Sequence, residues 1–121
     1  MIRRGDFHPE SGYRAARSLL ERRDAPAAIF ACNDLMALGA LRAAAESGRQ
    51  VPADLAIVGF DDIELASFTS PPLTTIAQPK ADLGRLAVQW LIEHIADKSR
   101  PPRRELLPTR LIVRGTCGGQ A

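Results

Sequence analysis

The chain has 121 residues, of which 45% are hydrophobic and 25% charged, and its net charge at pH 7 is +2. This length gives one domain or part of one, with enough apolar residues for a packed core. The arginines occur as separated pairs, which argues against a nucleic-acid surface, and no apolar run is long enough to span a membrane.

The first half of the chain alternates between strand-forming and helix-forming segments. Apolar residues at helical spacing mark the helices, and short runs of Ile, Val and Phe mark strands of the buried type. In chain order we expect a strand at 1–5, a helix at 9–23, a strand at 27–31, a helix at 35–47 and a strand at 55–60.

The second half continues the same alternation. After an irregular stretch at 61–72 with one helical turn, we expect a strand at 73–78, a long helix at 79–97, a Pro/Arg linker at 100–104 and a strand at 106–115. Apolar strands that alternate with helices predict an α/β fold with a mostly parallel sheet.

Polar side chains follow two of the predicted strands at the point where each strand ends. Asn33 and Asp34 follow the second strand, and Asp61 and Asp62 follow the third. Phe7 follows the opening strand at the same edge of the sheet. Because parallel sheets bind ligands outside the carboxyl ends of their strands, this arrangement predicts a pocket for a sugar or a small heterocycle. The polar groups would satisfy hydroxyls, and the aromatic ring would cover an apolar ring surface.

Each of these residues also has a purely structural interpretation. Asn33 or Asp34 could serve only as the N-cap of the helix that follows, because both residue types are good caps. Asp62 could cap the following turn, and Phe7 could be an ordinary core residue. The sequence pattern leaves these alternatives open.

The doubled aspartate also admits an enzymatic interpretation, since two carboxylates at a strand end can bind Mg²⁺. Such a site needs further acids and a well-placed Lys or Thr, whereas Thr74, Thr75 and Lys80 lie at or beyond the start of the next strand. There is no P-loop, GxGxxG or GxSxG motif. Cys32, expected as a buried thiol, and Cys117 lack zinc-ligand spacing. We therefore expect no enzyme activity, catalytic residue, metal or cofactor, with a small magnesium-dependent phosphate-handling enzyme as an alternative.

Several longer motifs carry a family resemblance. The stretches GDFHPESGYRAARSLL, AIFACNDLMALGALRAAAESGRQVPADLAIVGFDD, SPPLTTIAQPKADLG and TRLIVRGTCG resemble the C-terminal part of LacI/GalR-type transcriptional regulators. The resemblance runs from Gly5 to Gly118. It implies an α/β fold that is a partial flavodoxin-like, periplasmic-binding-protein-like three-layer sandwich with a mostly parallel sheet, truncated at its N-terminal side.

The resemblance also implies a domain organisation. Residues 1–78 would form the second lobe of an effector-binding domain, without its first strand and flanking helices. Residues 79–105 would be a crossover helix of the otherwise missing first lobe, and residues 106–118 would return to the second lobe as a strand. Residues 119–121 would be a disordered tail. The chain is accordingly expected to be a fragment that lacks the DNA-binding domain.

The implied function is effector binding and dimerisation in a transcriptional regulator. A sugar-like small molecule would bind between two lobes and change the affinity of the dimer for its operator. Asn33 and Asp61 match ligand-contacting positions of the family, and Phe7 matches the aromatic residue that packs on the ligand. Lys80 stands where members often have an aromatic pocket residue, and it favours an acidic or highly hydroxylated ligand.

The expected partners follow from the same resemblance. A homodimer would use residues 35–41 and 63–70, and DNA would be contacted only through a domain absent from this chain. With no signal peptide or membrane segment, we expect a cytoplasmic location. Because the Trp90 face of the long helix lacks its lobe, the fragment is further expected to dimerise by exchanging or re-docking residues 79–98. A solute-binding protein of a sugar transporter, which shares the fold, is the other alternative.

Overall fold

The computed structural model describes residues 1–119 and divides the chain into two compact units. The first unit comprises Met1–Ala77 and the chain from Leu111 onward, and the second comprises Gln78–Arg110. Residues 120–121 of the predicted tail lie outside the described residues.

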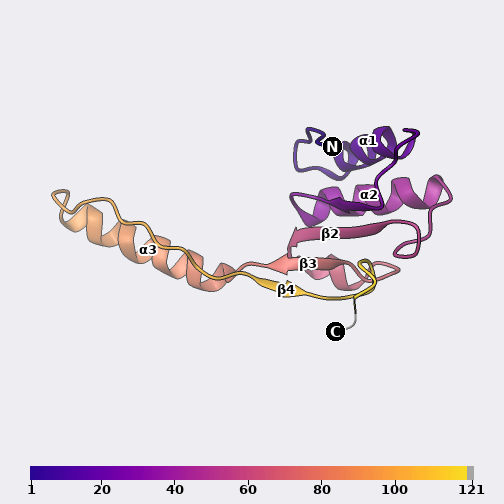
Figure 1. Cartoon of the computed structure of the whole chain (residues 1–121). Helices are drawn as coiled ribbons and strands as arrows, with labels where there is room; N and C mark the ends of the chain where they lie inside the picture. Colours follow the sequence, from indigo (N-terminus) through magenta and orange to yellow (C-terminus); the bar gives the residue numbers. More distant parts are fainter. Residues whose placement is uncertain (120–121) are drawn as a thin grey trace. The chain divides into compact units, whose positions relative to one another are not determined.

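The helices and strands follow the predicted order with one exception at the N-terminus (Figure 1). The strand predicted at 106–115 is present only in its central part. In chain order the elements are α1 (Pro9–Leu20), β1 (Ala28–Phe30), α2 (Asp34–Glu46), β2 (Ala56–Asp61), the 3-10 helix η1 (Glu64–Ser67), β3 (Thr74–Ala77), α3 (Lys80–Ala96) and β4 (Arg110–Ile112).

The predicted opening strand is wrong, because residues 1–5 have no regular secondary structure. The sheet has the order β1-β2-β3-β4, so β1 is an edge strand and nothing in the described part of the chain pairs with its outer side. A strand requires a neighbour for its backbone hydrogen bonds. The N-terminal segment contacts α1 instead, where Arg3 Nε donates to the Ser18 hydroxyl at 3.0 Å.

The sheet itself is confirmed as mostly parallel. Strand β2 pairs in parallel with β1 on one side and with β3 on the other. The register sets Phe30 opposite Val58, and Asp61 opposite Ala77. The carboxyl ends of the three strands therefore meet at one edge of the sheet, as the α/β fold class requires.

Helix α2 lies between α1 and the sheet, which explains why its sequence is apolar nearly all round. Two glycines allow the close approach of the helices. A Cβ atom at Gly12 would lie 2.2 Å from the Met36 carbonyl oxygen, and one at Gly39 would lie 2.0 Å from the Pro9 carbonyl oxygen. The backbones of α1 and α2 are thus in direct contact, and the alanines of α2 complete the core.

An apolar groove of about 430 Å³ lies beside the outer edge of β1 and is lined by the N-terminal segment, α1, β1 and α2. Phe30 is 58% exposed there. Cys32 is also exposed, so its prediction as a buried thiol is wrong. The reason is that β1 is an edge strand of the described sheet, so the side chains at its end are left uncovered.

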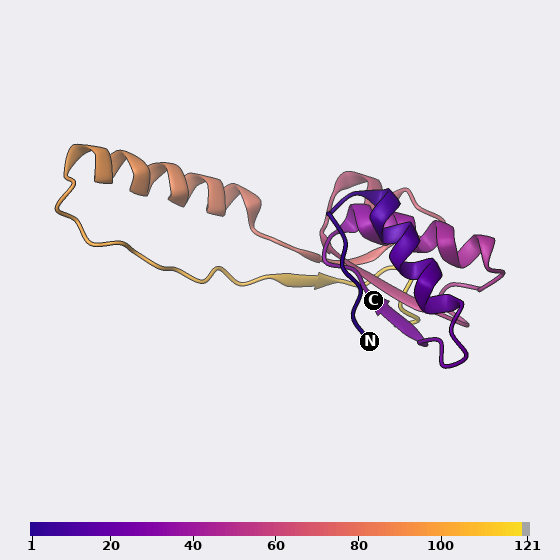
Figure 2. The ribbon, with the colours of Figure 1, turned by 90° about the horizontal axis from the view of Figure 1, so that it is seen from above.

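The second unit consists of α3 and the segment that returns along it towards β4 (Figure 2). No residue of α3 is buried. A cavity of about 340 Å³ separates part of the helix from the returning segment, and there the Arg103 guanidinium lies 5.9 Å from the Trp90 ring centroid. Within residues 1–119, no helix is both long and apolar enough to cross a bilayer.

Candidate functional site

The two polar pairs predicted from the sequence meet at the carboxyl edge of the sheet. The Ala31 N–H donates to the Val58 carbonyl at 2.8 Å, so the parallel register extends past the end of β1. Asn33 follows the end of β1 by three positions, and Asp61 is the last residue of β2. Residues that are 28 positions apart in the sequence therefore lie at neighbouring strand ends, as the ligand-site prediction requires.

Asn33 is the N-cap of α2, as its residue type predicts. Its Oδ1 accepts a hydrogen bond from the Met36 N–H at 2.9 Å. Its Nδ2 donates to the Phe7 carbonyl oxygen, also at 2.9 Å. An asparagine amide has two donor hydrogens and an oxygen with two lone pairs, so these two bonds use half of its capacity. Asn33 is only 8% exposed, and its amide fixes the position of the Phe7 backbone.

Phe7 is 61% exposed, so its interpretation as a core residue is wrong. Its φ angle is +66°, which is uncommon for a residue with a side chain. The turn around it is fixed by Asp6, whose carboxylate accepts the His8 N–H at 3.0 Å. The Ser11 hydroxyl, and then this backbone bond, hold the pKa of Asp6 below its ordinary value. The Phe7 side chain is thereby left at the surface, while its carbonyl oxygen is bonded to Asn33.

Asp34 is completely buried and serves the fold. Its Oδ1 accepts the Thr75 hydroxyl at 2.5 Å and its Oδ2 accepts the Ile63 N–H at 2.9 Å. The carboxylate lies directly over Gly59, where an added Cβ atom would be 2.2 Å from Oδ1. The glycine of the VGFDD stretch is therefore required because the side chain of Asp34 occupies the space above it.

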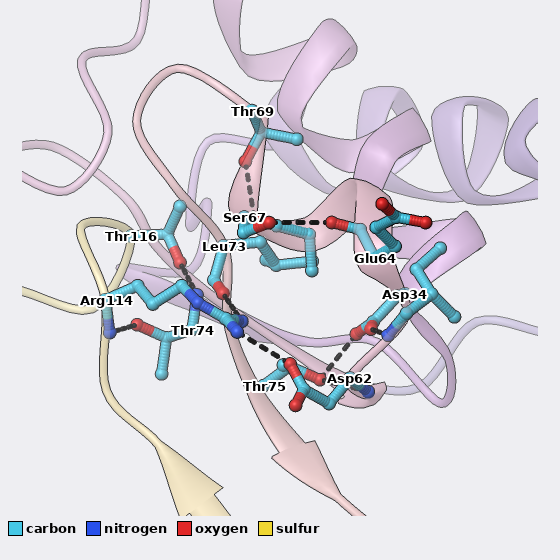
Figure 3. A network of polar contacts seen from close by, with 12 residues as sticks. Asp34, Asp62, Glu64, Ser67, Thr69, Leu73, Thr74, Thr75, Arg114 and Thr116 are labelled. Carbon is cyan, nitrogen blue, oxygen red and sulfur yellow. Dashed lines mark hydrogen bonds and ion pairs between the residues drawn. The ribbon is translucent and has the colours of Figure 1, made fainter.

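Asp62 forms an ion pair that the sequence analysis missed (Figure 3). Its Oδ1 accepts from Arg114 Nη2 at 2.7 Å, and its N–H donates to the Thr75 hydroxyl oxygen at 3.4 Å. The side chain does not cap η1, whose N-cap is Ile63, so the cap interpretation of Asp62 is wrong. Arg114 lies 52 residues away in the sequence, and no local pattern points to the pair.

Three residues other than glycine have a positive φ angle in the described part of the chain, and all three belong to this site. They are Phe7, Asp61 with a φ of +114° and Asp62 with a φ of +50°. Such conformations cost about 1–3 kcal/mol each and tend to occur where function requires them. Two of the three, Phe7 and Asp61, are predicted ligand contacts.

Lys80, the fourth predicted ligand contact, is the first residue of α3 and belongs to the second unit. It is exposed and follows Ala77, the register partner of Asp61, by three positions in the chain. Asn33 and Asp61 thus lie at the ends of neighbouring strands, Asn33 bonds the Phe7 backbone, and Lys80 belongs to the other unit. Among residues 1–119, no three His, Cys, Asp or Glu side chains are grouped in a way that could hold a metal ion.

Known proteins resemble this chain over almost its whole length. Residues 1–117 match the model of the periplasmic binding protein-like domain. The chain is 51% identical over 94 residues to the HTH-type transcriptional repressor PurR of Haemophilus influenzae (strain PittEE), an alignment that covers 78% of this chain and 28% of that protein.

Solved structures agree with the sequence comparison. The transcriptional regulator CelR in complex with cellobiose is 43% identical, with a TM-score of 0.87 over 93% of this chain and 34% of that one. The lac repressor dimer bound to operator and the anti-inducer ONPF is 40% identical, with a TM-score of 0.84 over 93% of this chain and 39% of that one. The chain spans 28% to 39% of the length of these three proteins.

Proposed function

Because this chain belongs to the periplasmic binding protein-like domain family, in the form found in LacI-type transcriptional regulators, we propose that it is part of the effector-binding domain of such a regulator. The effector is a sugar-like small molecule that binds at the carboxyl edge of the sheet. The observation that supports this proposal is that Asn33 and Asp61 lie at the ends of neighbouring strands, that Asn33 bonds the Phe7 carbonyl oxygen, and that Phe7 and Asp61 both have positive φ angles.

Each residue has a distinct role in the proposed site. The Asp61 carboxylate accepts hydrogen bonds from effector hydroxyls, Asn33 supplies an amide donor and acceptor, and the exposed Phe7 ring covers the apolar face of a sugar ring. Lys80 is proposed as a fourth contact on the family resemblance alone. That CelR was solved with cellobiose supports a sugar-like effector.

The geometry argues against the magnesium-dependent enzyme. The Asp62 carboxylate is paired with Arg114, and the Asp34 carboxylate is bonded to Thr75 and to the Ile63 N–H. Asp62, one of the two adjacent aspartates on which this alternative rests, is therefore already paired with a protein cation. The relatives named above are transcriptional repressors, which are not enzymes, and the absence of catalysis in this chain is part of the proposal.

The proposal extends to assembly and location. Leu35, Leu65 and Phe68 are 36%, 51% and 75% exposed, and they fall within the two segments expected to form a homodimer. The lac repressor structure is itself a dimer on its operator, which supports this arrangement. We further propose that DNA is contacted through a domain outside these 121 residues and that the protein is cytoplasmic. The second unit is proposed to be the crossover between the two lobes. Sedimentation should detect a dimer that dissociates in Phe68→Asp.

Binding by the isolated chain is expected to be weak, since one lobe supplies part of the contacts. Saturation-transfer NMR with a panel of monosaccharides and disaccharides, cellobiose included, detects affinities in the millimolar range, about −4 kcal/mol. At least one sugar should give a signal that disappears in Asp61→Ala and persists in Asp54→Ala, which removes an exposed carboxylate from another turn. The proposal fails if no sugar gives a signal, or if Asp61→Ala leaves it unchanged.

A further inference from the structure

We propose that Arg114 is a positioning residue for effector recognition, which holds the Asp61–Asp62 turn in the conformation that presents Asp61. This inference rests on the proposed function, because it assumes that Asp61 contacts the effector. Arg114 lies two residues after β4 and forms its ion pair with Asp62, next to the proposed contact residue.

The Asp61–Asp62 turn needs stabilising tertiary contacts because both of its residues have positive φ angles. A backbone conformation of this kind persists only where the surrounding structure over-determines it. Three of the contacts around the turn contribute to this. The Thr75 hydroxyl accepts the Asp62 N–H, Asp34 accepts the Ile63 N–H, and Arg114 binds the Asp62 carboxylate. Of these contacts, the one to Arg114 is the shortest, at 2.7 Å, and the only one in which both partners are charged.

Arg114 is itself fixed at several points, so it can act as an anchor. Its Nη1 donates to the Leu73 carbonyl at 2.9 Å, and its backbone N–H donates to the Thr74 hydroxyl at 2.8 Å (Figure 3). The planar guanidinium thus joins Leu73, the residue before β3, to the turn with two of its nitrogens. Arg114 and Asp62 are only 21% and 27% exposed, so the pair is less screened by water than surface ion pairs are.

Thr116 connects the segment that carries Arg114 to the core. Its hydroxyl donates to the Ile57 carbonyl of β2 at 2.6 Å and accepts the Thr74 N–H at 2.8 Å. The segment that follows β4 is therefore tied to both β2 and β3, and Arg114 extends this tie to the turn that carries Asp61. We expect effector affinity to depend on Arg114 although Asp61, and not Arg114, makes the contact.

The test uses the 121-residue chain and two variants that break the pair from opposite ends, Arg114→Gln and Asp62→Asn. Arg42→Gln is the control, because it removes an ion pair of similar length that is exposed, 2.8 Å from Arg42 Nε to Glu46. NMR reports the turn directly: a positive φ angle brings a residue's own N–H and Hα close together and gives an intense cross-peak. Amide hydrogen exchange of Asp62 and Ile63 reports its opening.

Both pair-breaking variants should weaken the cross-peaks of Asp61 and Asp62 and speed exchange of the Asp62 amide by about tenfold to a hundredfold, as expected for loss of a charged hydrogen bond. The affinity for the sugar that binds the wild type should fall with them, and Arg114→Lys should recover part of it. The Arg42→Gln control should change neither. Unchanged cross-peaks and exchange in Arg114→Gln and Asp62→Asn would overturn the positioning role. Absence of sugar binding by the wild type would instead overturn the proposed function. The backbone measurements need no sugar, so they test the positioning role separately from the proposed function.

Discussion

Replacing Asp34 by alanine should be among the most damaging single changes in the first unit. The substitution leaves the Thr75 hydroxyl and the Ile63 N–H without the acceptors they have at 2.5 and 2.9 Å. Each unsatisfied buried donor costs about 1–3 kcal/mol, so the expected loss is about 2–6 kcal/mol. A small domain is stable by only about 5–15 kcal/mol, so this loss threatens the fold itself.

Asp34→Asn keeps the shape of the side chain and one acceptor oxygen, and the Thr75 hydroxyl can turn to accept from the new amide. Asp34→Asn should therefore be less stable than the wild type and more stable than Asp34→Ala. Urea unfolding measures both variants, with Asp54→Ala as the exposed control, for which a much smaller loss is expected. A loss below about 1 kcal/mol in Asp34→Ala, or equal losses in the two Asp34 variants, would refute the assignment of these hydrogen bonds.

Three further predictions concern the helices, the aromatic residue and acid stability. Gly39→Ala places a Cβ atom 2.0 Å from the Pro9 carbonyl oxygen and should cost at least about 1–3 kcal/mol in urea unfolding. In the control variant Gly84→Ala, the added Cβ atom in α3 meets nothing within 4 Å, and helicity in circular dichroism should rise because alanine favours a helix over glycine by about 1 kcal/mol. If Gly39→Ala is no less stable to urea than Gly84→Ala, the close crossing of α1 and α2 is refuted. Phe7→Gly relieves a positive φ angle and should raise stability by about 1 kcal/mol while weakening sugar binding, whereas a ring with no ligand role would leave binding intact. Finally, the Tyr13 hydroxyl, followed by Arg42, lowers the pKa of Glu46 in the folded chain. The stability that this pKa shift contributes is present above the ordinary glutamate pKa of 4.5 and is lost as the pH falls through the lowered pKa. The free energy of unfolding should therefore fall less on acidification in Tyr13→Phe than in the wild type.

The order of elements could be predicted because each one carries its own local signal. Asn33 before an apolar helical run predicted the start of α2, and the β-branched run around Thr74 predicted β3. The strand expected at 1–5 failed because strand formation depends on a neighbour, which local sequence does not report.

The candidate site was predictable only in part, for the same physical reason. Strand ends in a parallel sheet share an edge, so Asn33 and Asp61 could be placed together from the sequence. The pairs Asp34–Thr75 and Asp62–Arg114 could not, since they join residues 41 and 52 positions apart. The positive φ angles of Phe7 and Asp61 likewise depend on tertiary contacts, because phenylalanine rarely adopts one and the +114° of Asp61 lies outside the left-handed region that aspartate can occupy.

The central claim is that an effector contacts this chain at Phe7, Asn33 and Asp61. Mapping amide chemical-shift changes on the ¹⁵N-labelled chain, during titration with the sugar that binds, tests it most directly. The account predicts that the largest changes fall on these three residues and their immediate neighbours at the carboxyl edge of β1 and β2. Changes centred instead on the apolar groove at Ala28–Cys32, or on the Trp90 cavity of the second unit, would contradict it.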